Sequence, residues 1–251
     1  MKSNGDMAHS PGFPKRVPLT FSVISASAEG QGKTGERREV FGTFNNECFV
    51  LSRGVEGLAH GDTASRLIVD TALWAYKLVR LRPFYWGDKT KFLKRIFRSS
   101  NLAVWQKRRE TGFEDGLFGT LLVLMVGPKS FWIGTAGDSS AYLYRNHILK
   151  KLTNEDRNTK GVVTKALGFQ RLGLVPAITI GHLDAHDVLL LTSVSIPHRE
   201  EKHDVSDILS RTGTTPESLK DAAEEIVQWT RGGSRENGTV CIVKRIVSYG
   251  T

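Results

Sequence analysis

The chain has 251 residues, 39% of them hydrophobic, so it can bury a substantial core, most simply as one domain. Its longest apolar run, Leu121–Val126, is far too short to cross a bilayer, which argues against membrane-spanning helices and a membrane partner. The net charge of +9 favours acidic partners, but zinc-finger spacing, an RNA-recognition signature and a basic zipper are all missing, so nucleic acid is the less favoured partner.

The first 18 residues contain Gly, Ser, Asn and three prolines without the apolar stretch of a signal peptide. We therefore predict a disordered lead-in over residues 1–18, a single domain over residues 19–251 and a cytoplasmic location. The two cysteines, Cys48 and Cys241, fall in predicted strands. Two isolated cysteines suggest small buried apolar side chains rather than a disulfide framework.

The first part of the domain reads as strands followed by two helices. Alternating and β-branched residues predict strands over Leu19–Ala28, Val40–Phe44 and Cys48–Ser52. A helix is predicted over residues 63–80, with Asp62 or Thr63 as its N-cap.

A second helix is predicted over residues 88–109. Its apolar side, which includes Phe92 and Phe97, faces the core, and its basic side faces solvent. A nucleic-acid surface would need stacking aromatic residues on the basic side, and these two lie opposite it.

A meander of antiparallel strands occupies the middle of the chain. Its strands are expected at Leu121–Val126, Phe131–Ala136, Ala141–Tyr144 and Ile148–Leu152. The uninterrupted apolar run of the first strand indicates that both of its faces are covered. Between the second and third strands, the turn at Gly137 and Asp138 places a carboxylate at the rim of the sheet. Asp138 either caps its own turn, which turn chemistry favours, or is available to a metal or a set of amides.

The last part of the domain returns to strands and helices. Strands are predicted at Thr164–Leu167, Ala177–Ile180, Asp187–Thr192 and Val240–Val247, and helices at Asp204–Thr212 and residues 216–230. Strands, two helices, more strands, helices and a final strand indicate an α+β sandwich with helices outside.

The central segment resembles the type 2C, metal-dependent (PPM-type) serine/threonine phosphatases. That family has Gly-Thr-Thr before an apolar run, then Gly-Asp-Ser-Arg-Ala-Tyr, then Leu-Thr. Nine residues of this chain match, and Ser140 stands where arginine is usual. The matching residues are Gly119, Thr120, Gly137, Asp138, Ser139, Ala141, Tyr142, Leu152 and Thr153. The resemblance covers residues 20 to 247 and implies a four-layer α-β-β-α sandwich of two antiparallel sheets flanked by helices, with Leu121–Val126 and Asp187–Leu191 as central strands.

Working members of the family hold two metal ions with a cluster of aspartates, because hard dications prefer oxygen ligands that balance their charge. In the first family motif, Lys33 stands at the phosphate-gripping arginine, and either Arg38 or Glu39 stands at the metal aspartate. The second motif aligns without gaps from Arg53 to Ser65. It keeps Gly54, but Arg53 replaces the metal-bridging aspartate.

The two remaining motifs differ from each other in what they keep. In the third, Ser193 agrees but Val194 replaces the metal aspartate. In the fourth, Glu236 and Asn237 stand at Asp-Asn, so a carboxylate is retained. The residual carboxylates are therefore Glu39, Asp138 and Glu236. Two dications beside Arg53 would repel the guanidinium, so we expect no metal cofactor.

The sequence supports three functional hypotheses. The main one is a catalytically inactive phosphatase-like domain, a pseudophosphatase, acting as a binding or regulatory module for a protein partner, with phosphorylated protein as one candidate. The first alternative is a divergent metal-dependent serine/threonine phosphatase with a reduced site at Glu39, Asp138 and Glu236, using Mg²⁺ or Mn²⁺. The second alternative is a basic surface that binds nucleic acid or another anionic partner.

Two roles are open for Arg53. Its guanidinium could bind phosphate, since arginine matches phosphate oxygens bidentately. The competing account, which we favour, is an internal salt bridge from Arg53 to Glu56, Asp138 or Glu236.

Overall fold

A computed structural model describes residues 19–29, 39–55, 57–58, 60–82, 87–113, 116–193, 196, 199–231 and 238–249 of the chain. In these residues the strands form two antiparallel five-stranded sheets. One sheet has the order β1 (Leu19–Glu29), β10 (Thr239–Tyr249), β9 (Val188–Thr192), β6 (Ser140–Arg145) and β7 (Ile148–Lys151). The other has the order β2 (Glu39–Phe44), β3 (Cys48–Gly54), β4 (Gly119–Val126), β5 (Ser130–Ala136) and β8 (Ala177–His182).

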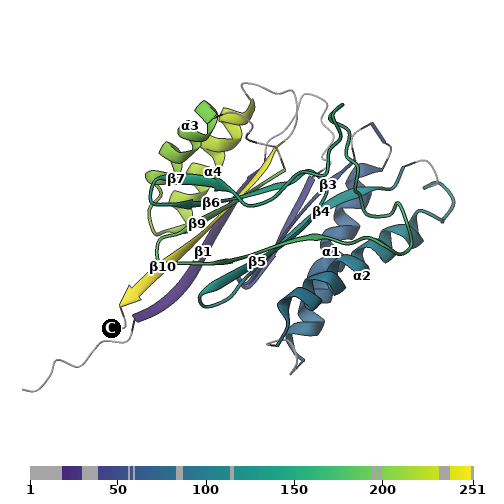
Figure 1. The fold of residues 1–251 in the computed structure, drawn as a ribbon, viewed down its shortest axis with the longest axis horizontal. Coiled ribbons are helices and arrows are strands. Elements are labelled where there is room, and N and C mark those ends of the chain that lie inside the picture. Colours follow the sequence, from purple (N-terminus) through teal and green to yellow (C-terminus); the bar gives the residue numbers. More distant parts are fainter. Residues whose placement is uncertain are drawn as a thin grey trace, which may run out of the picture.

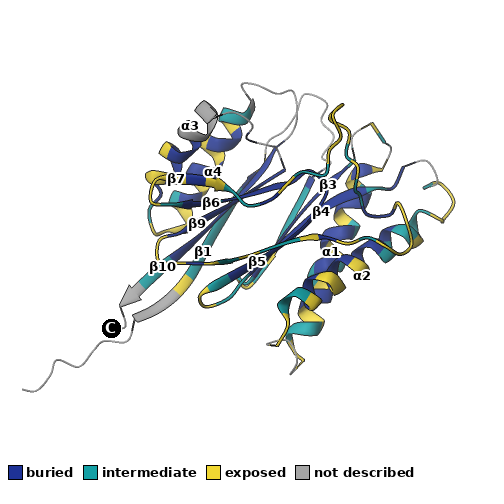
Figure 2. Ribbon diagram, viewed as in Figure 1, coloured by how far each residue is buried: buried dark blue, intermediate teal, exposed yellow. Residues whose placement is uncertain are grey.

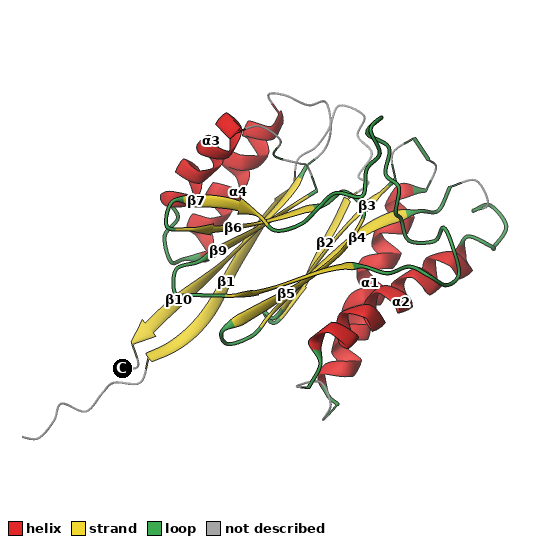
Figure 3. Ribbon diagram, in the orientation of Figure 1, coloured by secondary structure: helices red, strands yellow, loops and turns green. Residues whose placement is uncertain are grey.

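The sheets face each other, and helices cover their outer sides (Figure 1, Figure 3). Helices α1 (Gly61–Arg80) and α2 (Lys89–Lys107) share an apolar core with the β2–β8 sheet. Helices α3 (Arg199–Ser210) and α4 (Pro216–Arg231) share another with the β1–β7 sheet. Figure 2 shows the buried side of each helix turned toward its sheet. The predicted α-β-β-α sandwich is confirmed.

The alternation of side chains along β4 explains its uninterrupted apolar sequence. Leu121, Val123 and Met125 belong to the core beneath α1 and α2, whereas Leu122 and Leu124 belong to the core between the two sheets. Both faces of the strand are therefore buried. β4 is the middle strand of one sheet and β9 the middle strand of the other, which confirms both predicted central strands.

Two local predictions are wrong. Helix α1 begins after His60, which has a left-handed backbone with φ of 60° and makes no side-chain capping bond, so neither Asp62 nor Thr63 is the N-cap. The stretch 164–167 is no strand; it contributes one isolated bridge, between Leu167 and Gly119. Thr164 is the one β-branched residue of this stretch, so its strand signal is weak.

Two further predictions concern burial. Phe92 and Phe97 lie in the core beneath α2, as predicted. Cys48 and Cys241 are buried, unpaired thiols, and burial raises the pKa of both far above the ordinary thiol value. Across the described ranges, no helix combines the length and apolar character needed to cross a bilayer.

Lys89, at the start of α2, carries a testable cost to stability. Burial lowers its pKa to about 8, against an opposing effect of Glu47. The unfolded chain holds this proton more tightly, so stability should rise with pH between about 8 and the ordinary lysine value. We expect Lys89→Met to raise the free energy of unfolding at pH 7 by about 1 kcal/mol, a figure reduced for partial solvent exposure, and the gain to vanish near pH 10.5. Urea melts at both pH values test this. Lys94→Met, at an exposed position of the same helix, should leave the free energy of unfolding unchanged at both pH values.

Candidate functional site at one end of the sandwich

The residues that match the family motifs gather at one end of the two sheets. Antiparallel pairing places the start of β2 beside the end of β3, since Glu39 pairs with Arg53. The same end of β3 pairs with the start of β4, where Thr120 opposes Arg53. In the other sheet, the end of β9 meets the start of β10. A hydrogen bond joins the sheets there, because the Thr239 hydroxyl donates to Glu39 Oε2 at 2.9 Å.

Arg53 lies between two carboxylates at this end. Its Nε is 3.6 Å from Glu39 Oε1, and its Nη1 is 3.7 Å from Asp138 Oδ2. All three residues are buried, with 8% of Arg53, 8% of Glu39 and 3% of Asp138 exposed. The expected internal salt bridge to Asp138 is thus present, and Glu39 is a further partner that the sequence reasoning did not name.

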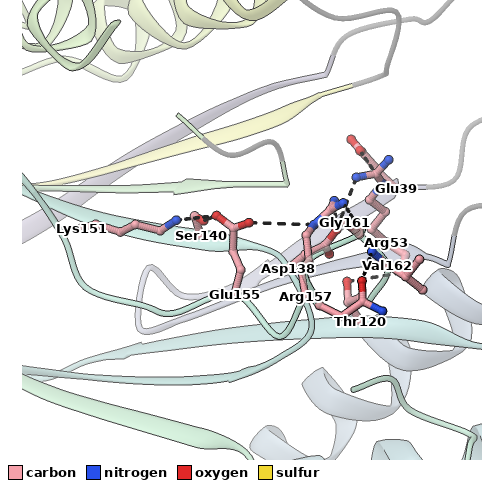
Figure 4. A network of polar contacts seen from close by, with 11 residues as sticks. Glu39, Arg53, Thr120, Asp138, Ser140, Lys151, Glu155, Arg157, Gly161 and Val162 are labelled. Carbon is pink, nitrogen blue, oxygen red and sulfur yellow. Dashed lines mark hydrogen bonds and ion pairs between the residues drawn. The ribbon is translucent and has the colours of Figure 1, made fainter. Parts of the chain in front are cut away.

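Asp138 pairs with a second guanidinium, that of Arg157, through Oδ2 (Figure 4). Its other oxygen, Oδ1, is buried and has no hydrogen-bond partner among the described residues. The favoured prediction that Asp138 caps its own turn is therefore wrong. Arg157 comes from the segment between β7 and β8, and it also donates through Nη1 to the Gly161 carbonyl at 2.7 Å. Sequence reasoning missed it because residues 154–163 have no periodic pattern and were matched to no family motif.

The Gly-Asp turn is held by the same segment. The Gly137 amide donates to Asp156 Oδ2 at 3.0 Å, and the Asp156 amide donates to the Gly137 carbonyl at 2.9 Å. Gly137 has a φ of 117°, and a Cβ there would meet Thr120 at 2.4 Å, so no other residue fits. The turn that presents Asp138 is therefore fixed on both sides.

Opposite charges pair in the described part of the site. Each carboxylate there has at least one cationic neighbour: Arg157 and Lys151 are near Glu155, and Lys165 is 3.0 Å from Asp156. Among the described residues of this network, the cationic and anionic side chains are equal in number. The cations are Arg53, Lys151, Arg157 and Lys165, and the anions are Glu39, Asp138, Glu155 and Asp156.

Several predicted site residues lie outside the described residues. The structure places Glu39, Arg53, Gly54 and Asp138 together at this end. The predicted site residues outside the described ranges are Lys33, Arg38, Glu56, Val194, Glu236 and Asn237. Their roles, and the choice between Arg38 and Glu39 at the first family aspartate, stay predictions.

The described residues do not fit a pair of dications. Within the ranges that the structure describes, no cluster of three or more His, Cys, Asp or Glu side chains could hold a metal ion. Glu39 and Asp138, the described carboxylates that pair with Arg53, have its guanidinium between them. A dication would have to displace this guanidinium before either carboxylate could bind it, because like charges repel strongly in a buried site.

Comparison by sequence finds serine/threonine phosphatases. The phosphatase stp from two strains of Listeria monocytogenes is 23% identical over 220 residues, which covers 80% of this chain and 85% of the relative. No family model matches the chain.

Comparison by structure finds the same class of protein. The catalytic domain of the phosphatase PstP, solved with two manganese ions, has a TM-score of 0.73 at 22% identity, over 91% of this chain and 100% of that one. PppA of Pseudomonas aeruginosa has a TM-score of 0.70 at 23% identity, over 90% and 98%. A bacterial serine phosphatase has a TM-score of 0.76 at 19% identity, over 89% and 98%.

The main functional prediction from the sequence, a catalytically inactive binding module, is contradicted by these findings. The sequence relatives are serine/threonine phosphatases, and the match covers most of their length. The divergent phosphatase is therefore the better supported hypothesis. The resemblance predicted from the sequence is confirmed, and the chain has the fold of the type 2C, metal-dependent serine/threonine phosphatases.

Proposed function

We propose that this chain is a divergent serine/threonine phosphatase that hydrolyses phosphate monoesters on phosphorylated proteins. The observation that carries the proposal is the sequence match to serine/threonine phosphatases over 80% of the chain. The position of the motif residues supports it, because Arg53, Gly54 and Asp138 meet at one end of the sandwich, where Thr239 of the other sheet donates to Glu39.

Two arginines of the site are candidate donors to a phosphate group. Arg53 and Arg157 both approach Asp138 Oδ2, and a guanidinium is a planar donor that suits phosphate oxygens as well as carboxylates. A phosphate monoester that entered the site would compete with Asp138 for these donors. Glu39 and Asp138 are the described carboxylates of the reduced site, and Glu236 is the third that the sequence suggests.

In this proposal, Mg²⁺ or Mn²⁺ is a component of the assay and not an assigned part of the site. One structural neighbour was solved with two manganese ions. Because Arg53 separates Glu39 from Asp138, the described residues support no catalytic step through such a pair. Activity in chelator and activity with added metal are therefore separate questions.

The test is hydrolysis of p-nitrophenyl phosphate and of a phosphothreonine peptide, in Mn²⁺, in Mg²⁺ and in chelator. We expect turnover in at least one condition, and a loss of roughly 100-fold in Asp138→Asn, because this carboxylate positions Arg53 and Arg157. Glu225→Gln is the matched control, since its carboxylate pairs with Arg211 on the exposed side of α4. Absence of turnover in all three conditions would overturn the proposal, as would turnover that Asp138→Asn leaves unchanged.

A further inference from the structure

Three arginines stack on aromatic rings beside the candidate site. Arg108 lies over the Phe118 ring, with 4.8 Å from its Cζ to the ring centroid. Arg109 and Arg171 both lie over the Trp105 ring, at 4.9 and 5.5 Å. Cation–π contacts of this kind hold a guanidinium in place without neutralising its charge.

These guanidiniums differ from those of the site. Among the described residues, the side chains of Arg108, Arg109 and Arg171 form neither an ion pair nor a hydrogen bond to a carboxylate, whereas Arg53 and Arg157 are both ion-paired. Three uncompensated charges held on rigid rings make a site for anionic groups, and arginine–aromatic pairs are frequent anchors of protein interfaces.

The surface has a fixed conformation, because a buried side chain of α2 holds the segment between β7 and β8 that carries part of it. Asn101, in α2, is 2% exposed. Its Nδ2 donates to the carbonyls of Gln170 and Arg171 at 2.8 and 3.2 Å, and its Oδ1 accepts from the Gly168 amide at 2.9 Å. The segment between β7 and β8 therefore lies against the C-terminal half of α2 (Figure 1).

Exposed apolar side chains border the arginines. Phe169 is 67% exposed and contacts the Phe118 ring at 5.8 Å between centroids, and Leu172 is 61% exposed. Large apolar side chains that gather beside charged ones on a surface mark contact sites for other proteins. The chemistry calls for a partner with both acidic and apolar side chains.

The surface is continuous with the candidate site. Phe118 precedes β4 by one residue, and Thr120 pairs with Arg53 in the neighbouring strand. Two residues of extended chain span about 7 Å. Leu167 is bridged to Gly119, so the segment that carries Phe169 and Arg171 starts at the same point. A peptide with its phosphorylated residue at Arg53 would reach this surface a few residues away.

We infer that the surface of Trp105, Arg108, Arg109, Phe118, Phe169 and Arg171 binds the acidic and apolar residues that flank the phosphorylated residue of a protein substrate. The inference depends on the proposed function only for the place of the phosphorylated residue. The contact between the surface and an acidic peptide is independent of catalysis and is measured separately. Acidic flanking residues would then distinguish preferred substrates from others.

The experiment measures fluorescence anisotropy of a labelled, unphosphorylated peptide that combines Asp, Glu and Leu, with the full chain. We expect binding that weakens with salt and is roughly tenfold weaker in Arg109→Gln/Arg171→Gln. The matched control is Arg95→Gln/Arg98→Gln, which removes two exposed charges of α2 that stack on no aromatic ring among the described residues, and it should bind as wild type.

Three results would overturn the inference: no binding to the acidic peptide, equal losses in the two double variants, or displacement of the peptide by a single-stranded oligonucleotide at lower concentration, which would assign the surface to nucleic acid. If the phosphatase is active, KM for an acidic phosphopeptide should rise in Arg109→Gln/Arg171→Gln while kcat stays constant. Peptide binding without any phosphatase activity would refute the proposed function and leave the acidic-peptide surface standing.

Discussion

Replacing Arg53 by methionine should lower the free energy of unfolding by about 3 kcal/mol at neutral pH, because removing one member of a buried network of ion pairs weakens the compensation of the carboxylates that remain. Glu39 would lose the guanidinium at 3.6 Å, and Asp138 would keep that of Arg157 alone. Urea melts measure the loss. The control is Arg80→Met, whose partner Glu47 is a third exposed, and which should cost less than about 1 kcal/mol.

A charge reversal at Arg53 tests whether this position can hold a metal ligand. Arg53→Asp would group three carboxylates where the family motif has its metal-bridging aspartate. We expect this variant to be less stable than Arg53→Met in chelator and to recover with millimolar Mn²⁺, since a ligand that binds only the folded state raises its stability. Asp138→Asn in the same background should abolish the recovery. If Mn²⁺ left the melting temperature of Arg53→Asp unchanged, the interpretation of Arg53 as the replacement of a metal ligand would be contradicted.

The architecture could be predicted because its signals are local. The apolar run at 121–126 indicated a strand covered on both faces, and β4 is such a strand. The amphipathic pattern of residues 88–109 indicated a helix with Phe92 and Phe97 in the core, where both lie. Periodicity reports burial, and burial decides which layer an element joins.

The polar network of the site could be predicted only in part. The gapless motif identified Arg53, and its charge suggested Asp138 as a partner. Arg157 could not be found, because its contact with Asp138 depends on how an aperiodic segment folds back. The bond between Thr239 and Glu39 joins residues 200 positions apart in two different sheets, a distance over which no sequence pattern extends.

Gly54, which follows Arg53 at the end of β3, has no room for a side chain. A Cβ at this position would lie 2.3 Å from the Gly61 Cα and 2.5 Å from its carbonyl carbon and oxygen. These are backbone atoms at the start of α1, so they cannot move aside as a flexible side chain would. We expect the contact between the end of β3 and the first residue of α1 to fix the position of Arg53, which precedes Gly54.

Gly54→Ala should therefore cost about 3 kcal/mol of unfolding free energy, at the upper end of overpacking effects, because the strand end and the helix must separate. Gly57→Ala is the matched control from the same motif. Nothing lies within 4 Å of its Cβ position, but its φ of 78° is left-handed, so we expect a smaller cost of about 1 kcal/mol from backbone strain. Chemical denaturation of the two variants separates steric overlap from strain. If Gly57→Ala proved the more damaging, close packing of β3 on α1 would not be what holds Arg53 in place.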